Sequence, residues 1–220
     1  MAGEELIQPS AARPACTPAT PRCLFWEWGP EAVRPACCTE HLKDLVFFTA
    51  DLLTREGIAF WADFGTLLGA VREGAIIAFD YDADFSVYAR DRERIAALAP
   101  EFAARGHELE VREDHIWRIF LSPANRNHLD LFPFYPEGGE LRLPGPYAGR
   151  SAFPAFWAER LAPVRLYGRE LPAPAPAEEF LIRYRYGPGY RSPMRHYAAP
   201  FDPGFRAVIR HLERKGRGTP

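Results

Sequence analysis

Three aspartates alternate with apolar or aromatic residues in one short stretch of the chain, at Asp80, Asp82 and Asp84. The residues that flank and separate them are Phe79, Tyr81, Ala83 and Phe85. Alternate side chains of an extended strand share a face, so the pattern predicts a strand with one face on the core and three carboxylates on the other. Like charges at this spacing repel one another. We therefore expect a compensating cation, and hard oxygen ligands favour Mg2+ or Mn2+.

A further acid, Asp130, stands inside the apolar stretch that runs from His128 to Phe134. If this second strand lies beside the first, Asp130 completes an acidic cluster with Asp82 and Asp84. An aspartate-rich strand end can equally be a solvated edge, and the pattern alone leaves both interpretations open.

A Gly65-Thr66 turn follows a short apolar strand and opens a helix. Backbone N–H groups and the helix dipole at such a position can face an anionic phosphate, and the Thr66 hydroxyl can add a contact. Arg72 could reach the same phosphate if the helix turns that side inward. The alternative is an ordinary helix cap with a surface arginine.

The length and the hydrophobic periodicity predict one compact α+β domain with a mixed sheet. The first helix is expected to start at Thr39, as N-cap, and to stop at Gly57. Pro176 and Gly187 mark the two ends of a later helix, and the Pro-Ala alternation at 171–177 suggests a linker or surface strap. Further expected helices cover residues 67–72, 91–105 and 203–215, and expected strands cover 58–62, 76–88 (as a pair), 107–112, 116–121 and 128–134.

The first 38 residues are rich in proline and hold all four cysteines, Cys16, Cys23, Cys37 and Cys38. Four thiolates can satisfy tetrahedral zinc, which would order a segment with few apolar contacts. The spacing is not that of a standard zinc knuckle, so the spacing alone favours a zinc site and free or loosely paired thiols equally. We expect a cysteine-rich segment over residues 1–38 and a catalytic domain over 39–220.

Charge and hydropathy limit the partners. The formal net charge is −2, whereas proteins that bind the phosphate backbone of nucleic acids carry a strong excess of positive charge. No nucleic acid partner is therefore expected. The first 30 residues contain no apolar run of signal-peptide or membrane-span length. This predicts a chain with no membrane span and a cytoplasmic location.

Four segments together resemble the LicD/fukutin family of the nucleotidyltransferase superfamily. They are Gly65–Arg72, Ile76–Asp84, Leu129–Tyr135 and Tyr186–Gly189, and the resemblance covers roughly residues 40–200. It implies a nucleotidyltransferase-like mixed β-sheet with flanking helices. The order of the cysteines, two separated and then an adjacent pair, is also similar to that of a zinc-binding loop found in this family, which favours structural Zn2+ on Cys16, Cys23, Cys37 and Cys38.

The resemblance implies an activity. Members of the family transfer phosphocholine or ribitol phosphate from a CDP-activated donor to a glycan hydroxyl, with CMP as the leaving group. By this resemblance Asp82 and Asp84 hold Mg2+ and Asp80 supports them. Asp130 ligates the metal or accepts the proton of the hydroxyl. The phosphate-binding residues are then Gly65, Thr66 and Arg72.

Two other functions stay open. An ordinary nucleotidyltransferase would release pyrophosphate, and a non-catalytic member would bind a nucleotide or glycan without turnover. The histidines His115, His128 and His196 could also act near the cleft, although a structural or surface role is expected for each. The transferred group, the acceptor and the oligomeric state are not indicated by the sequence.

Overall fold

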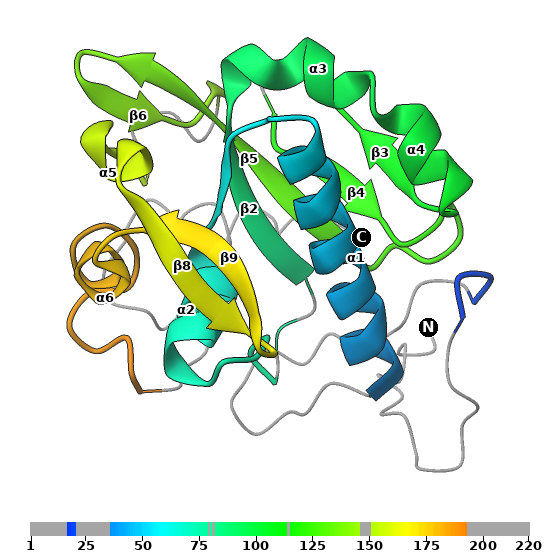
Figure 1. Cartoon of the computed structure of the whole chain (residues 1–220), viewed down its shortest axis with the longest axis horizontal. Helices are drawn as coiled ribbons and strands as arrows, with labels where there is room; N and C mark the ends of the chain where they lie inside the picture. The colour runs from blue at the N-terminus through cyan, green and yellow to red at the C-terminus, as the bar shows by residue number, and fades with distance from the viewer. Residues whose placement is uncertain are drawn as a thin grey trace, which may run out of the picture.

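The computed structural model describes residues 17–20, 36–78, 80, 82–113, 115–145 and 151–192. Its centre is a seven-stranded sheet whose main path has the order β1-β2-β5-β4-β3 (Figure 1). The strands of this path are β1 (Phe60–Ala62), β2 (Asp82–Tyr88), β5 (His128–Glu137), β4 (Trp117–Phe120) and β3 (Glu108–Glu110). Two short strands, β6 (Glu140–Arg142) and β7 (Phe153–Pro154), extend the sheet beyond β5. The expected mixed α+β architecture is confirmed.

The pair β2 and β5 is parallel, whereas every other neighbouring pair in the sheet is antiparallel. The register places Asp82 opposite His128 and Asp84 opposite Asp130. Because the pair is parallel, both strands begin at the same edge of the sheet. The polar residues at their amino ends are therefore brought together, as the sequence requires if Asp130 is to join the other aspartates.

The connection between these parallel strands covers one end of the sheet. It holds the short 3-10 helix η1 (Ala89–Asp91), α3 (Arg92–Ala96) and α4 (Ala99–Ala104), followed by β3 and β4. The single helix expected over residues 91–105 is wrong, because the helix is interrupted at Ala97 and Leu98. Pro100 has no N–H to continue the α3 ladder, so it begins a new helix in the first turn of α4.

The longest helix, α1 (Ala36–Arg55), packs on β5 and β2 and crosses the sheet in Figure 1. The helix starts at Ala36, three residues before Thr39, so the expectation that Thr39 is its N-cap is wrong. Cys38 is buried and lies one turn before buried Leu42, so the apolar stripe of the helix extends further back than the threonine signal suggested. Cys37 and Cys38 thus lie in the first turn of α1.

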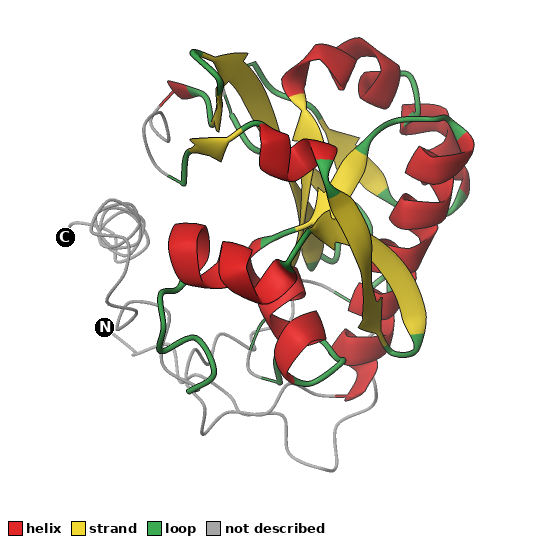
Figure 2. Cartoon of the chain, turned by 60° about the vertical axis from the view of Figure 1, so that its left-hand side comes forward, coloured by secondary structure: helices red, strands yellow, loops and turns green. Residues whose placement is uncertain are grey.

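A second layer is formed by α2 (Phe64–Arg72) and the two-stranded hairpin of β8 (Leu161–Leu166) and β9 (Arg169–Pro174). The linker expected at 171–177 is wrong over its first four residues, which belong to β9. Leu171 and Ala173 alternate into the core, and pairing with β8 supplies a partner that the sequence did not reveal. In Figure 2 the strands of the central sheet lie between helices on either side.

The C-terminal part of the described chain confirms the helix expected at 177–186. It consists of α6 (Ala177–Phe180) and a π-helical turn, η3 (Leu181–Arg185), with Tyr186 as the C-cap. The strand pair expected over 76–88 is wrong, because β2 is the one strand among the described residues of this range and buried Ile76 and Ile77 lie in a loop. The short helix α5 (Phe156–Glu159) was not anticipated, and the helix expected at 203–215 falls outside the described residues.

Within the ranges that the structure describes, no helix is both long enough and apolar enough to cross a bilayer.

Candidate metal centre

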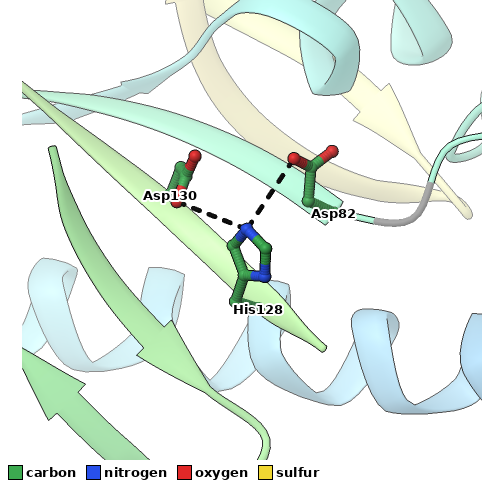
Figure 3. Close-up of side chains that lie close together, drawn as sticks. All are labelled: Asp82, His128 and Asp130. Atoms are coloured by element: carbon green, nitrogen blue, oxygen red, sulfur yellow. Dashed lines mark ion pairs between the residues drawn. The ribbon is translucent and has the colours of Figure 1, made fainter. Parts of the chain in front are cut away.

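Three side chains at the shared edge of β2 and β5 converge on one point (Figure 3). His128 Nε2 lies 3.8 Å from Asp82 Oδ2 and 3.6 Å from Asp130 Oδ1. One ligand atom from each of the three residues lies within 4.8 Å of the others. The register of the parallel pair explains the convergence, since His128 is the direct partner of Asp82 and Asp130 stands two residues further along the same face of β5.

The imidazole of His128 is oriented by the backbone. Its Nδ1 lies 3.0 Å from the carbonyl oxygen of Arg126, and because a carbonyl can only accept, this nitrogen carries the proton. The Nε2 atom of His128 therefore faces the two carboxylates, and in the neutral ring it would offer its lone pair to a cation between them. A metal-binding histidine is commonly held in this way, so the geometry makes His128 a candidate ligand, whereas the sequence favoured a structural or surface role.

Asp84 stands on the same strand and is held by the first turn of α2. The Thr66 backbone N–H donates to Asp84 Oδ2 at 3.2 Å, and the Asp84 N–H donates to Thr66 Oγ1 at 2.7 Å. A Cβ atom on Gly65 would lie 2.5 Å from Asp80 Oδ2 and 3.0 Å from Asp84 Oδ2. The glycine-threonine turn thus packs directly against the acids, and only glycine leaves room for the carboxylates at position 65.

Burial makes the acidic cluster costly to ionise. It is the largest cause that raises the pKa of the Asp82 carboxyl well above its usual range, and the charges of neighbouring aspartates raise it further. Burial likewise raises the pKa of Asp84, followed by the charges of Asp80 and Asp130, while the bond from the Thr66 amide opposes this rise. A bound cation would remove this penalty, because an opposite charge favours the ionised carboxylates.

Arg118 supplies positive charge to the cluster and was not singled out from the sequence. It is the antiparallel partner of Asp130, and its Nε donates to Asp130 Oδ1 at 2.8 Å. The side chain is 37% exposed. The only available signal was one arginine inside the otherwise apolar strand β4. Arg72, in contrast, lies in the last turn of α2, at the opposite end from Gly65, and pairs with Glu73 at 2.9 Å.

Tyr186 opens one of the segments that resemble the family, but no role at the site was predicted for it. Burial raises the pKa of its phenol well above the usual range, and the charges of Asp84 and Asp80 raise it further, so the phenol lies within electrostatic range of the acidic cluster. Its position directly after η3 brings the C-terminal part of the described chain to the site. The Tyr186-Gly-Pro-Gly sequence marks the turn but carries no pattern that would have linked it to the aspartates.

The four-cysteine zinc site stays a prediction. Cys37 lies at the start of α1 and Cys38 is buried there, whereas Cys16 and Cys23 lie outside the described residues. His196 also lies outside them, and His115 Nδ1 is 3.2 Å from the carbonyl of Ile116.

The donor set of Asp82, His128 and Asp130 fits a divalent cation. Two carboxylate oxygens and one imidazole nitrogen are ordinary ligands of such ions, and the raised pKa values indicate a site that gains from positive charge. The structure therefore defines an α+β domain whose parallel strand pair carries a carboxylate-rich candidate cation site.

Comparison with protein families places this domain more closely. Residues 57–176, more than half of the chain, match the family described as LicD/FKTN/FKRP, nucleotidyltransferase domain. The chain belongs to this family, as the resemblance of its motifs indicated.

Two curated relatives carry the same name. The chain is 32% identical over 179 residues to the protein named Ribitol 5-phosphate transferase FKRP of Homo sapiens, covering 77% of this chain and 35% of that protein. It is also 32% identical over 163 residues to the Mus musculus protein of that name, covering 70% and 33%. The chain thus spans about a third of the length of these relatives.

Among solved structures, the lincomycin-bound lincosamide antibiotic adenylyltransferase LnuA aligns with a TM-score of 0.45 and 17% identity, over 64% of this chain and 85% of that chain. A likeness this distant has no bearing on function.

Proposed function

We propose that this domain is a metal-dependent phosphotransferase. In this proposal it moves a polyol phosphate such as ribitol phosphate, or phosphocholine, from a CDP-activated donor to a glycan hydroxyl and releases CMP. The observation that supports it most is the convergence of Asp82, His128 and Asp130 beside Asp84 in a chain of the LicD/FKTN/FKRP family. The name of the human and mouse relatives, ribitol 5-phosphate transferase, favours a polyol phosphate as the transferred group.

Asp82 and Asp130, with His128 between them, are the residues that would hold the cation, which we take to be Mg2+ or Mn2+. When bound, such an ion neutralises charge on the donor pyrophosphate and on the departing nucleotide phosphate. Asp84 and Asp80 add negative charge at the same edge, and Thr66 keeps Asp84 in place through its amide and hydroxyl. Asp130 ligates the metal or accepts the proton of the attacking hydroxyl.

The donor phosphate also needs a cationic side chain. Arg118 suits this role better than Arg72, because Arg118 contacts Asp130 and is partly open to solvent, whereas Arg72 lies at the far end of α2. Fixed positive charge beside a phosphate stabilises the charge that develops in transfer without reorganisation. The N–H of Gly65, at the start of α2, remains the proposed backbone contact. The Thr66 N–H instead donates to Asp84.

The direct test is to incubate the purified protein with CDP-ribitol, CDP-glycerol or CDP-choline, Mg2+ and candidate acceptor glycans, and to separate the nucleotide products by chromatography. We expect CMP from at least one donor, at a rate that rises with acceptor and disappears with EDTA. The alternative, an ordinary nucleotidyltransferase, is favoured by the family's nucleotidyltransferase description and would release pyrophosphate from a nucleoside triphosphate instead. Nucleotide or glycan binding with no turnover of any donor would favour the non-catalytic reading.

Variants of the acids test the assignment of residues. Asp82→Asn and Asp84→Asn should each abolish CMP release, since each removes a charge from the cluster that is proposed to hold the cation. Asp91→Asn is a matched control, because Asp91 is also a buried aspartate but pairs with Arg94 in the crossover connection. Near-normal turnover in both cluster variants would refute the assignment.

A further inference from the structure

The most deeply buried ion pair of the described structure lies outside the candidate metal triad. Arg185 Nε lies 2.6 Å from Asp63 Oδ1 and Arg185 Nη2 lies 2.8 Å from Asp63 Oδ2. The two side chains are 1% and 0% exposed. The pair joins the end of η3 to the residue before α2 across 122 positions of sequence, in the two-pronged geometry that an arginine makes with a carboxylate.

Asp63 organises the entry to α2. It is the N-cap of the helix and accepts a hydrogen bond from the Phe64 N–H at 2.8 Å. Ser86 Oγ of β2 donates to it at 2.8 Å, and Trp61 Nε1 of β1 at 3.2 Å. Removing one partner of such a pair leaves the other buried without its main polar partner, so the position of Asp63 depends on Arg185.

The next residue is held in a strained conformation. Phe64 has a φ of +40°, in the left-handed region that residues with a bulky side chain rarely adopt. Its ring lies under the Arg185 guanidinium, with 4.5 Å between the guanidinium carbon and the ring centroid. Strained backbone of this kind persists only where surrounding contacts determine it, and Arg185 contacts both residues of the turn.

This turn aims the first residues of α2 at the acids. Gly65 and Thr66 follow Phe64 directly. Gly65 lies close to the Asp80 carboxylate, and the Thr66 N–H donates a hydrogen bond to Asp84. If the turn relaxed, the Thr66 amide would move relative to β2, because no residue separates it from the strained segment except Gly65.

We propose that Arg185 is a positioning residue for the acidic cluster. By locking the Asp63–Phe64 turn, it holds the first turn of α2 against Asp84 and Asp80, and so sets the geometry of the cation site from the C-terminal π-helical turn η3. The expected effect of Arg185 on cation binding and turnover rests on the proposed function. Its expected effect on the position of Thr66 is independent of that function.

The test uses the full chain with Arg185→Met and Arg185→Lys, and Arg94→Met as the control. Arg94 pairs with Asp91 and with the carbonyls of Glu56 and Gly57, so its loss removes an ion pair elsewhere. The first readout is the amide resonance of Thr66 in protein labelled with 15N-threonine, assigned by its absence in Thr66→Ser. The second is affinity for Mn2+ measured by electron paramagnetic resonance, and the third is kcat and KM for CMP release.

In Arg185→Met we expect the Thr66 amide to move upfield as its bond to Asp84 weakens, and Mn2+ affinity and kcat to fall on the order of tenfold or more. Arg185→Lys keeps the charge but not the two-pronged bond, and should shift both readouts part of the way. It also decides the matter if the methionine variant does not fold. Arg94→Met should lower only the melting temperature.

A wild-type Thr66 resonance in folded Arg185→Met or Arg185→Lys would overturn the positioning role. If wild-type protein neither binds Mn2+ nor releases CMP, the proposed function fails. The Thr66 resonance still decides the role of Arg185 in that case.

Discussion

Asp130 lies between an arginine and a histidine, with Arg118 Nε at 2.8 Å and His128 Nε2 at 3.6 Å from the same Oδ1 atom. Arg118 and His128 thus hold the Asp130 carboxylate beside Asp82. The Asp82 carboxyl lies near His128 and the other aspartates, and because burial raises its pKa well above the usual range, its ionised form gains from a bound ion.

Substitution of Arg118 by glutamine should therefore lower kcat/KM for the CDP-linked donor by roughly 10- to 100-fold, since a group that orients a metal ligand typically contributes this much. The measurement is steady-state CMP release under saturating Mg2+. Arg112→Gln is the control, because the exposed Arg112 pairs with Glu110 and not with the cluster. Equal kinetics for both variants would remove Arg118 from the site.

Gly65→Ala tests the close approach of the α2 turn to the acids. The added methyl group would lie 2.5 Å from Asp80 Oδ2 and 3.0 Å from Asp84 Oδ2, so the carboxylates must move. Because Asp80 can swing away at its flexible end, we expect a large loss of CMP release with a small change in melting temperature. Gly189→Ala is the control: a Cβ at this position has no atom within 4 Å, so CMP release and melting temperature should both stay unchanged. Full activity of Gly65→Ala would contradict the described geometry.

Among the elements, α2 and the loop that follows it connect the turn to the aspartates. Gly69 of α2 packs against this loop, and a Cβ there would lie 2.3 Å from the Ala75 carbonyl oxygen and 3.2 Å from the Ile77 nitrogen. The β8–β9 hairpin holds the other side of the loop, with Tyr167 Oη accepting from the Ile76 N–H at 3.2 Å. The path of the chain from α2 to Asp80 is thus fixed from two directions.

Gly69→Ala should destabilise the domain by about 1–3 kcal/mol, the usual cost of forcing extra atoms into a packed site. The direction of the change in the free energy of unfolding is informative, because replacing glycine by alanine inside a helix otherwise stabilises a protein by roughly 0.5–1 kcal/mol. Urea unfolding followed by circular dichroism measures the change. An increase in the free energy of unfolding would show that the loop does not pack on α2 as described.

Local patterns predicted the elements that carry their own signal. The alternation of Asp80, Asp82 and Asp84 corresponds to β2 only from Asp82 onward, since Asp80 precedes the strand and the expected three-carboxylate strand is wrong at that residue. The apolar run around Asp130 and the Pro176–Gly187 boundaries each correspond to an observed element. What could not be predicted depends on partners distant in sequence. The strand β9 exists because β8 pairs with it, and Arg118 and His128 reach the cluster only through the register of β5 with its neighbours. The bond between Arg185 and Asp63 has no local signal at all.

For the whole molecule, the acidic cluster makes stability depend on pH and on divalent ions. Folded Asp82 and Asp84 have pKa values raised above the unfolded value of about 3.9, so the folded state binds more protons than the unfolded state above that pH. Without metal, this contribution to stability is fully present below about pH 4 and is lost as pH rises through the raised values.

Mg2+ should reverse the loss at neutral pH, by about 2.7 kcal/mol at a concentration one hundred times its dissociation constant. Thermal unfolding at several pH values, with EDTA or with Mg2+, checks both statements. Asp82→Asn should lessen the pH dependence and the response to Mg2+ together. A melting temperature that is unaffected by Mg2+ at neutral pH would argue against an ion at the cluster.

The most direct measurement of the cation site is an anomalous difference map from crystals grown with Mn2+. The account predicts a peak at the shared edge of β2 and β5, within roughly 2.0–2.2 Å of carboxylate oxygens of Asp82 and Asp130. Absence of a peak there in well-diffracting crystals, or a peak only at sites remote from these two aspartates, would contradict it.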